Sequence, residues 1–180
     1  MKMMTLAPLS ALFVLAMAPM ALAQLTAASE GLIVYGHHHL TVTSIEESKK
    51  FWVDTLGGEA VTAGNLQFVK FPNVLVFMRE APPTGGTKGT TVNHLGFSVP
   101  STRAMVEKVR AAGYSIVTRD ELPPALAVDN GLAHIVDQDT YIGFAMTPDG
   151  VKVEFVEDRR QAESIALHHI HFAGPVDEMM

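Results

Sequence analysis

Apolar and polar positions alternate in short stretches along the chain, and this period of two predicts strands that each bury one face. The first such stretch, 36–43, is followed by Ser44 and, three residues later, Glu47, which is a capping box for a helix through about Leu56. The same order returns at 92–99. The pattern therefore predicts two units with a similar sequence of elements.

The remaining elements complete both units. A second helix is predicted from Ser101 to about Ala112. Further strands are predicted at 59–62, 66–71, 74–79, 114–118, 132–136, 141–146 and 151–157. The segment 119–131 contains Pro123-Pro124 and is expected to be a loop, as a rim or a lid. We therefore predict an α+β fold built from two β-α-β-β-β modules, over 33–79 and 90–158, within a domain spanning 33–158.

The opening strands of the two units can be aligned. The segments 37–42 and 94–99 correspond at a constant spacing of 57 residues. Side chains on a strand alternate between its faces, so the apolar positions of both segments are expected to face the helices. Three histidines then share the opposite face, His37, His39 and His94.

Alternation in the last strand adds a carboxylate to the histidine face. Glu154 shares this face, and the matching position in the first unit is Phe77. A lone histidine or glutamate on a strand is usually structural or solvated. Two imidazoles and one carboxylate together form a facial triad, which leaves coordination positions open on Fe(II), Mn(II), Ni(II), Co(II) or Zn(II). We therefore expect His37, His94 and Glu154 to bind a divalent metal ion.

The chain resembles the vicinal oxygen chelate superfamily, which includes glyoxalase I, extradiol dioxygenases, bleomycin and fosfomycin resistance proteins and methylmalonyl-CoA epimerase. The resemblance covers about 36–158 and rests on His37…Leu40-Thr41-Val42…Ser48…Phe51-Trp52…Leu56-Gly57-Gly58, Asn93-His94-Leu95-Gly96-Phe97-Ser98-Val99 and Pro148-Asp149-Gly150…Glu154. It implies that the paired modules form a curved mixed sheet with the metal in the cup between them. It also implies that His37, His94 and Glu154 are the metal ligands and that Glu154 is a catalytic residue.

Departures from the family patterns leave the reaction open. Phe77 stands where glyoxalase I-type sites have a further carboxylate, and Phe144 where the dioxygenase signature has a tyrosine. The resemblance implies a metal-dependent enzyme, a lyase or a dioxygenase, acting on a small substrate with vicinal oxygens. The alternatives are a binding protein of the bleomycin-resistance type and a metal-free structural relative. The residues expected to face the substrate are His39, Phe77, His134 and Tyr141.

Hydrophobic residues make up 48% of the chain, and they are most frequent in its first 23 residues. Lys2, an apolar stretch and Ala21-Leu22-Ala23 match a secretory signal peptide over 1–23, cleaved after Ala23. The competing interpretation is a membrane anchor, but Pro8 and Pro19 interrupt the apolar run. No later segment is long enough to cross a bilayer. We therefore expect a secreted or periplasmic protein.

Charge and cysteine content exclude several other functions. The chain has 13 basic and 19 acidic residues, so it offers no basic patch for nucleic acid. Without cysteine it has neither disulfides nor a zinc-thiolate site.

In the C-terminal extension, 159–180, the segment 168–172 resembles the opening strand of another unit. It predicts either a strand that pairs with a second copy in a homodimer, or the start of a further module in a longer protein.

Overall fold

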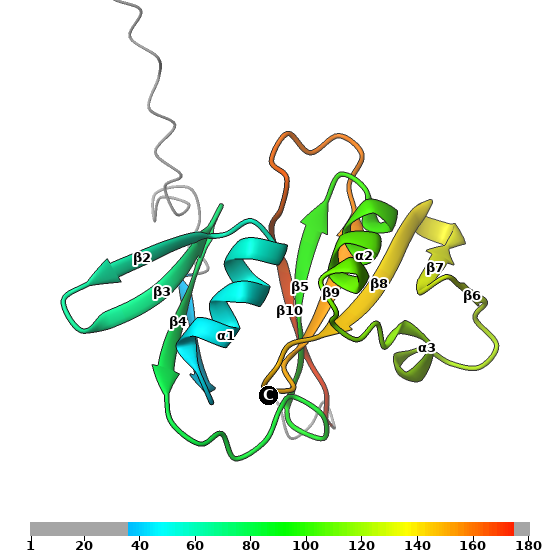
Figure 1. Ribbon diagram of the computed structural model, residues 1–180. Helices are drawn as coiled ribbons and strands as arrows, with labels where there is room; N and C mark the ends of the chain where they lie inside the picture. Colours follow the sequence, from blue (N-terminus) through cyan, green and yellow to red (C-terminus); the bar gives the residue numbers. More distant parts are fainter. Residues whose placement is uncertain (1–35, 175–180) are drawn as a thin grey trace, which may run out of the picture.

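The computed structural model describes residues 36–174 (Figure 1). The expected signal peptide and its cleavage point lie outside the described residues. The first module contains, in chain order, β1 (His37–Val42), α1 (Ile45–Lys49), the π-helical segment η2 (Lys50–Thr55), β2 (Glu59–Ala63), β3 (Leu66–Phe71) and β4 (Val74–Glu80). Its four strands form a mixed sheet in the order β1-β4-β3-β2, in which β1 and β4 are parallel.

The second module repeats this arrangement. It contains β5 (Val92–Val99), α2 (Thr102–Ala111), α3 (Thr118–Glu121), β6 (Val128–Asp129), β7 (Leu132–Ile135), the 3-10 turn η3 (Val136–Gln138), β8 (Thr140–Met146) and β9 (Lys152–Glu157). A last strand, β10 (Ala166–Phe172), joins its sheet, which has the order β10-β5-β9-β8-β7-β6. The predicted α+β class with two β-α-β-β-β modules is confirmed.

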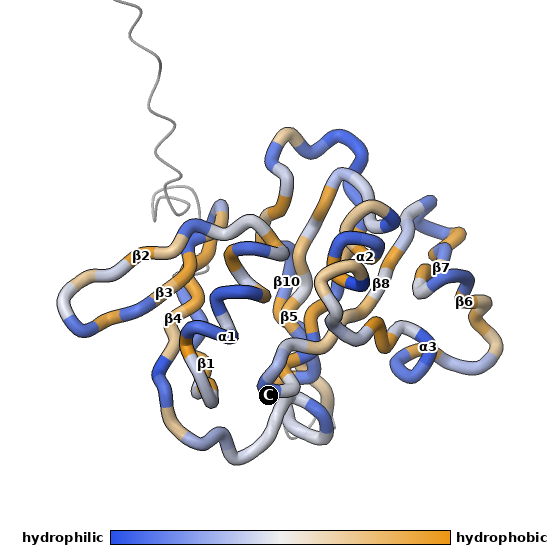
Figure 2. Tube along the Cα trace, in the orientation of Figure 1, coloured by the Kyte–Doolittle hydropathy of each residue, from blue (hydrophilic) through white to orange (hydrophobic). Residues whose placement is uncertain are grey.

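The helices cover one face of each sheet and form a common core with it. Ser44 and Ser101 cap the two helices, each accepting a hydrogen bond at its Oγ from a backbone N–H three residues later. The rings of Trp52, Phe71 and Phe97 meet in the core and are fully buried. Figure 2 shows that the outer turns of α1 and α2 are hydrophilic, while hydrophobic stretches run along β3, β4 and β5.

The Pro-Asp-Gly turn of the second module contacts the first module. Asp149 Oδ1 accepts a hydrogen bond from the backbone N–H of Thr43 at 2.9 Å, and Oδ2 accepts one from Ser48 Oγ at 3.3 Å. Thr43 lies just before the first helix, and Ser48 lies within it. The aspartate of this turn therefore connects the two modules.

The strand predicted at 114–118 does not form. Ile116 makes one isolated bridge to Ala145, and the chain then enters α3. Thr118 explains this change: its hydroxyl donates to the Gly131 carbonyl at 2.7 Å and accepts from the Phe144 N–H at 2.8 Å. A side chain thus takes over the sheet contacts that a longer strand would have made.

The segment 119–131, predicted as a loop, contains most of the short helix α3 and the two-residue strand β6. The guanidinium of Arg119 donates to three carbonyl groups of the segment at 2.7–2.8 Å, those of Leu122, Pro123 and Leu126. These bonds fix the fold of the segment from within.

In the described residues, no helix is both long and apolar enough to span a bilayer.

The C-terminal strand pairs within its own chain. β10 runs antiparallel to β5 and forms the edge of the second sheet next to the first module (Figure 1). Asn73, in the turn between β3 and β4, exchanges two hydrogen bonds with the backbone of Leu167, at 3.0 and 3.1 Å. The sequence predicts that this strand either pairs with a second copy in a homodimer or begins a further module of a longer protein. The homodimer and the longer protein both remain predictions.

Candidate functional site

Two of the expected ligands lie together on the second sheet. β5 and β9 are parallel neighbours, and their register pairs Gly96 with Glu154, so His94 and Glu154 share a face. The distance from His94 Nε2 to Glu154 Oε2 is 3.0 Å. Both residues are buried, with 5% and 8% of their surfaces exposed. The core of the predicted site is therefore a close imidazole–carboxylate pair in a shielded position.

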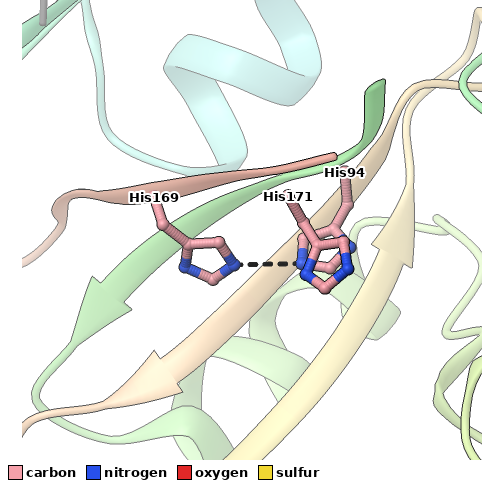
Figure 3. A group of neighbouring side chains, drawn as sticks. All are labelled: His94, His169 and His171. Carbon is pink, nitrogen blue, oxygen red and sulfur yellow. Dashed lines mark hydrogen bonds between the residues drawn. The ribbon is translucent and has the colours of Figure 1, made fainter. Parts of the chain in front are cut away.

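A histidine of β10 joins this pair. His169 Nε2 lies 3.1 Å from His94 Nε2 and 3.1 Å from Glu154 Oε2. Figure 3 shows the rings of His94 and His169 pointing toward each other from neighbouring strands. His171, two residues further along β10, stacks on His94 with a centroid distance of 4.7 Å. The ligand atoms of the three histidines all lie within 4.8 Å of one another.

A glycine makes room for the ring of His169. β10 pairs His169 with Gly96, and a Cβ atom built on Gly96 would lie only 2.3 Å from His169 Cε1. The corresponding position in the first module, at the spacing of 57 residues, carries His39. The second module therefore lacks a side chain at the place where the incoming histidine lies.

The hydrogen bonds around His94 fit a bound cation. Asn93 Oδ1 accepts a hydrogen bond from His94 Nδ1 at 2.9 Å, which leaves a lone pair on Nε2 of the neutral ring. That lone pair points at the carboxylate of Glu154 and at a second imidazole nitrogen. Protonating both rings would bring two positive charges within 3.1 Å. A divalent ion bound by His94 Nε2, His169 Nε2 and Glu154 Oε2 would satisfy all three atoms. In metal-binding histidines, the ring nitrogen that does not bind the metal typically donates a hydrogen bond to an oxygen atom, as Nδ1 of His94 does.

The carboxyl of Glu154 is ionised over a wide pH range. Burial raises its pKa, but the close contacts of the carboxylate with the rings of His169 and His94 together outweigh burial and lower the pKa to about 2. Burial also lowers the pKa of His171, as do His94 and His169 beside it. The cluster therefore keeps a negative charge on Glu154 while disfavouring protonation of His171.

The third expected ligand lies elsewhere. His37 packs against His39 and Phe77 on the first sheet, with centroid distances of 4.8 and 5.3 Å. Phe77 pairs in register with His39 and stacks on it. The structure thus gathers three predicted site residues around β1, and it does not place His37 in the histidine group around His94.

The other two expected substrate residues lie together, away from Glu154. His134 and Tyr141 are paired across β7 and β8, and their rings stack at 4.7 Å. Tyr141 is separated from Phe144 by three positions on β8, and Phe144 pairs with Glu154, so Tyr141 faces the opposite side of the sheet. His134 Nε2 lies 3.2 Å from Asp139 Oδ1, and this hydrogen bond lowers the pKa of Asp139.

Apolar residues cover the sheet next to the cluster. Phe144 lies edge-on to the His94 ring at 5.2 Å and belongs to a small buried group with Ala133 and Ile142. The segment around α3 packs on this group through Val117, Leu122, Leu126 and Val128. Lys152, on the same face of β9 as Glu154, is buried and forms an ion pair with Glu121 of α3. The predicted rim segment thus covers one side of the site.

A separate cavity of about 380 Å³ lies where β1 faces β10. Its lining includes Leu95 and Ile170, which alternate along their strands with His94, His169 and His171 and therefore face away from the cluster. Half of the remaining lining residues are also apolar, Leu40, Val92, Val151 and Phe172, and the others are Thr87 and the histidines 37–39. This cavity and the histidine cluster are two different features.

Sequence reasoning did not place His169 and His171 in the site. The signal was present, because 168–172 resembles the opening strands that carry His37 and His94. What the pattern could not supply was the partner strand. The antiparallel pairing of β10 with β5 brings these histidines to Glu154.

The model of the Glyoxalase/Bleomycin resistance protein/Dioxygenase superfamily matches residues 34–155. No curated protein sequence matches the chain. Among solved structures, that of SMU.1112c is similar at a TM-score of 0.52 and 20% identity, over 71% of this chain and 100% of that chain. A glyoxalase/dioxygenase from Nostoc punctiforme is similar at a TM-score of 0.50 and 17% identity, over 68% and 88% of the two chains. At these identities, the likeness shows a shared fold.

Proposed function

Because the chain belongs to the Glyoxalase/Bleomycin resistance protein/Dioxygenase superfamily, we propose that it is a metal-dependent enzyme acting on a small substrate with two adjacent oxygen atoms. The observation that carries this proposal is the buried pair of His94 Nε2 and Glu154 Oε2, 3.0 Å apart. A neutral imidazole and an ionised carboxylate are suitable ligands for a first-row divalent ion. The metal would be Fe, Mn, Ni, Co or Zn, as the donor types allow.

A bound divalent ion would act as a Lewis acid that stabilises negative charge on an oxygen of the substrate. The protein's own residues would prepare the site for this chemistry. Glu154 remains ionised because its pKa is about 2, so it is available as a ligand at neutral pH. Phe144 and the apolar segment around α3 exclude water from one side of the pair. Lys152, buried on the same face, forms an ion pair with Glu121 that holds α3 against the sheet beside the site.

A binding protein that sequesters a small molecule is the second candidate. The observation that favours it is the cavity between β1 and β10, whose apolar lining suits a hydrophobic ligand and lies away from His94 and Glu154. In that case the protein would bind its ligand without turnover. Export to the periplasm or the exterior, indicated by residues 1–23, belongs to either proposal.

Elemental analysis of protein purified without chelators tests the metal. We expect about one divalent ion per chain in the wild type and almost none in His94→Ala or Glu154→Gln. His134→Ala and Asp139→Asn are matched controls, since they remove the same chemical groups from an exposed pair. If the wild-type chain holds no divalent ion and takes up none when ions are added, metal dependence is wrong.

Turnover separates the enzyme from the binding protein. The metal-loaded protein is assayed against a panel of α-ketoaldehydes and catechols. Turnover that is lost in Glu154→Gln and retained in Asp139→Asn supports the enzyme. Saturable binding of a panel member that proceeds without chemical change supports the binding protein instead.

A further inference from the structure

The feature that extends the proposed function is the triangle of donor atoms formed by His94, Glu154 and His169. We propose that His169, supplied by the C-terminal strand β10, is the third protein ligand of the metal, in the place where the family resemblance predicts His37. This inference rests on the proposed metal dependence. It makes the segment after the two modules a part of the metal site.

The triangle of ligand atoms has a size that suits a metal ion. Its edges are 3.0 Å, 3.1 Å and 3.1 Å, between His94 Nε2, His169 Nε2 and Glu154 Oε2. Nitrogen and oxygen ligands bind first-row ions at about 2.1 Å, and two such ligands at a right angle are about 3.0 Å apart. The three atoms therefore have the spacing of one face of an octahedral site. A set of three protein ligands would leave coordination positions open for substrate oxygens.

Side chains outside the cluster hold the strand that carries His169 in place. Asn73 binds both the N–H and the carbonyl of Leu167, two residues before His169. Gln161, in the segment that leads into β10, donates from Nε2 to the Ser98 carbonyl of β5 at 3.0 Å. These contacts fix the position of β10 without any contribution from a metal. His169 is thus presented to His94 by a preformed arrangement.

The two modules differ at the positions that surround the site. In the second module, Gly96 leaves the space that the His169 ring fills, and Glu154 pairs with Gly96. In the first module, the same two positions hold His39 and Phe77, which stack on each other. The rings of His39 and Phe77 therefore lie beside His37. Phe77 occupies the strand position at which the second module has the carboxylate of Glu154. The donor set is complete only where β10 lies.

Titration with Co²⁺ or Mn²⁺ of the full, metal-stripped chain tests this assignment, with affinity measured by calorimetry. We expect His169→Ala to weaken binding by more than about 100-fold, which exceeds the usual effect of losing an outer hydrogen-bond partner. His37→Ala should change the affinity by less than about threefold. His134→Ala is the matched control, because it removes a histidine that lies away from the cluster.

A second variant displaces the ring of His169 without changing His169 itself. Gly96→Ala places a methyl group where the His169 ring lies, while His94 and Glu154 remain unchanged. We expect this variant to bind Co²⁺ at least tenfold more weakly, with an unchanged circular dichroism spectrum. Equal affinity of Gly96→Ala and wild type would count against the proposed position of the ring.

The outcomes distinguish this inference from the proposed function. Failure of the wild-type chain to bind any divalent ion overturns both. If the wild type binds and His169→Ala binds equally well, the ligand role of His169 is wrong while the metal dependence stands. A loss of more than about 100-fold in His37→Ala would show that His37 has not been replaced.

Discussion

At the scale of single residues, His38 differs from the histidines on either side of it because one of its ring nitrogens is buried without a hydrogen-bond partner. Its ring faces away from His37 and His39, and its buried Nε2 has no hydrogen-bond partner. Burial lowers the pKa of His38, and so does the neighbouring His37. The unfolded chain therefore binds a proton at His38 more readily than the folded chain does.

Replacing His38 by leucine should stabilise the fold and weaken its pH dependence. Removing a buried polar atom without a partner is expected to raise the free energy of unfolding by about 1 kcal/mol at pH 8. In the wild type, the lowered pKa makes stability fall as the pH drops below the unfolded value of about 6.5. His38→Leu should lose part of that fall, measured by urea denaturation at pH 8 and pH 5.5. His39→Leu, on the exposed face, serves as the control, and an equal change there would contradict the argument.

Residue types and spacing alone predicted part of the site. His94 and Glu154 were identified because alternation assigns each to a face of its strand, and the parallel register of β5 and β9 brings those faces together. The position of His169 depends instead on which strand pairs with which. Alternation places a residue on a face of its own strand and says nothing about the neighbouring strand.

At the scale of elements, the predicted strands and helices closely match the structure where local signals act alone. The prediction for 92–99 coincides with β5, and the capping serines start both helices. It was wrong at 114–118, where the hydroxyl of Thr118 makes the sheet contacts. The π-helical half of the first helix was also not predicted. There the Thr55 hydroxyl bonds to the Lys50 carbonyl, a contact that hydrophobic spacing does not register.

The attachment of β10 can be weakened through Asn73. Asn73→Gly removes both hydrogen bonds to Leu167 but keeps a residue that tolerates the positive φ of 65° at this turn. We expect the free energy of unfolding to fall by about 1–3 kcal/mol, because two partly buried backbone groups lose their partners. Asn130→Gly, at another turn with positive φ, is the matched control. Amide hydrogen exchange should show faster exchange in β10 of Asn73→Gly, and unchanged exchange there would refute the proposed attachment.

At the scale of the whole molecule, a metal that binds the folded chain should stabilise all of it. The proposed ligands come from β5, β9 and β10, and the unfolded chain does not hold them together. An ion present at 100 times its dissociation constant should add about 2.7 kcal/mol to the free energy of unfolding. Thermal unfolding with and without the ion measures this shift. The shift should disappear in His94→Ala and persist in His134→Ala; a shift retained in His94→Ala would place the ion elsewhere.

The strand order of the second sheet also has a consequence for synthesis. His94 and His169 are 75 residues apart in the chain, and β10 reaches β5 only after the rest of that sheet has been made. A nascent chain that stops before β10 can bring His94 and Glu154 together, but it lacks the third donor. Tight metal capture would therefore begin only after β10 has been made, and the ion would come from the compartment in which β10 pairs with β5.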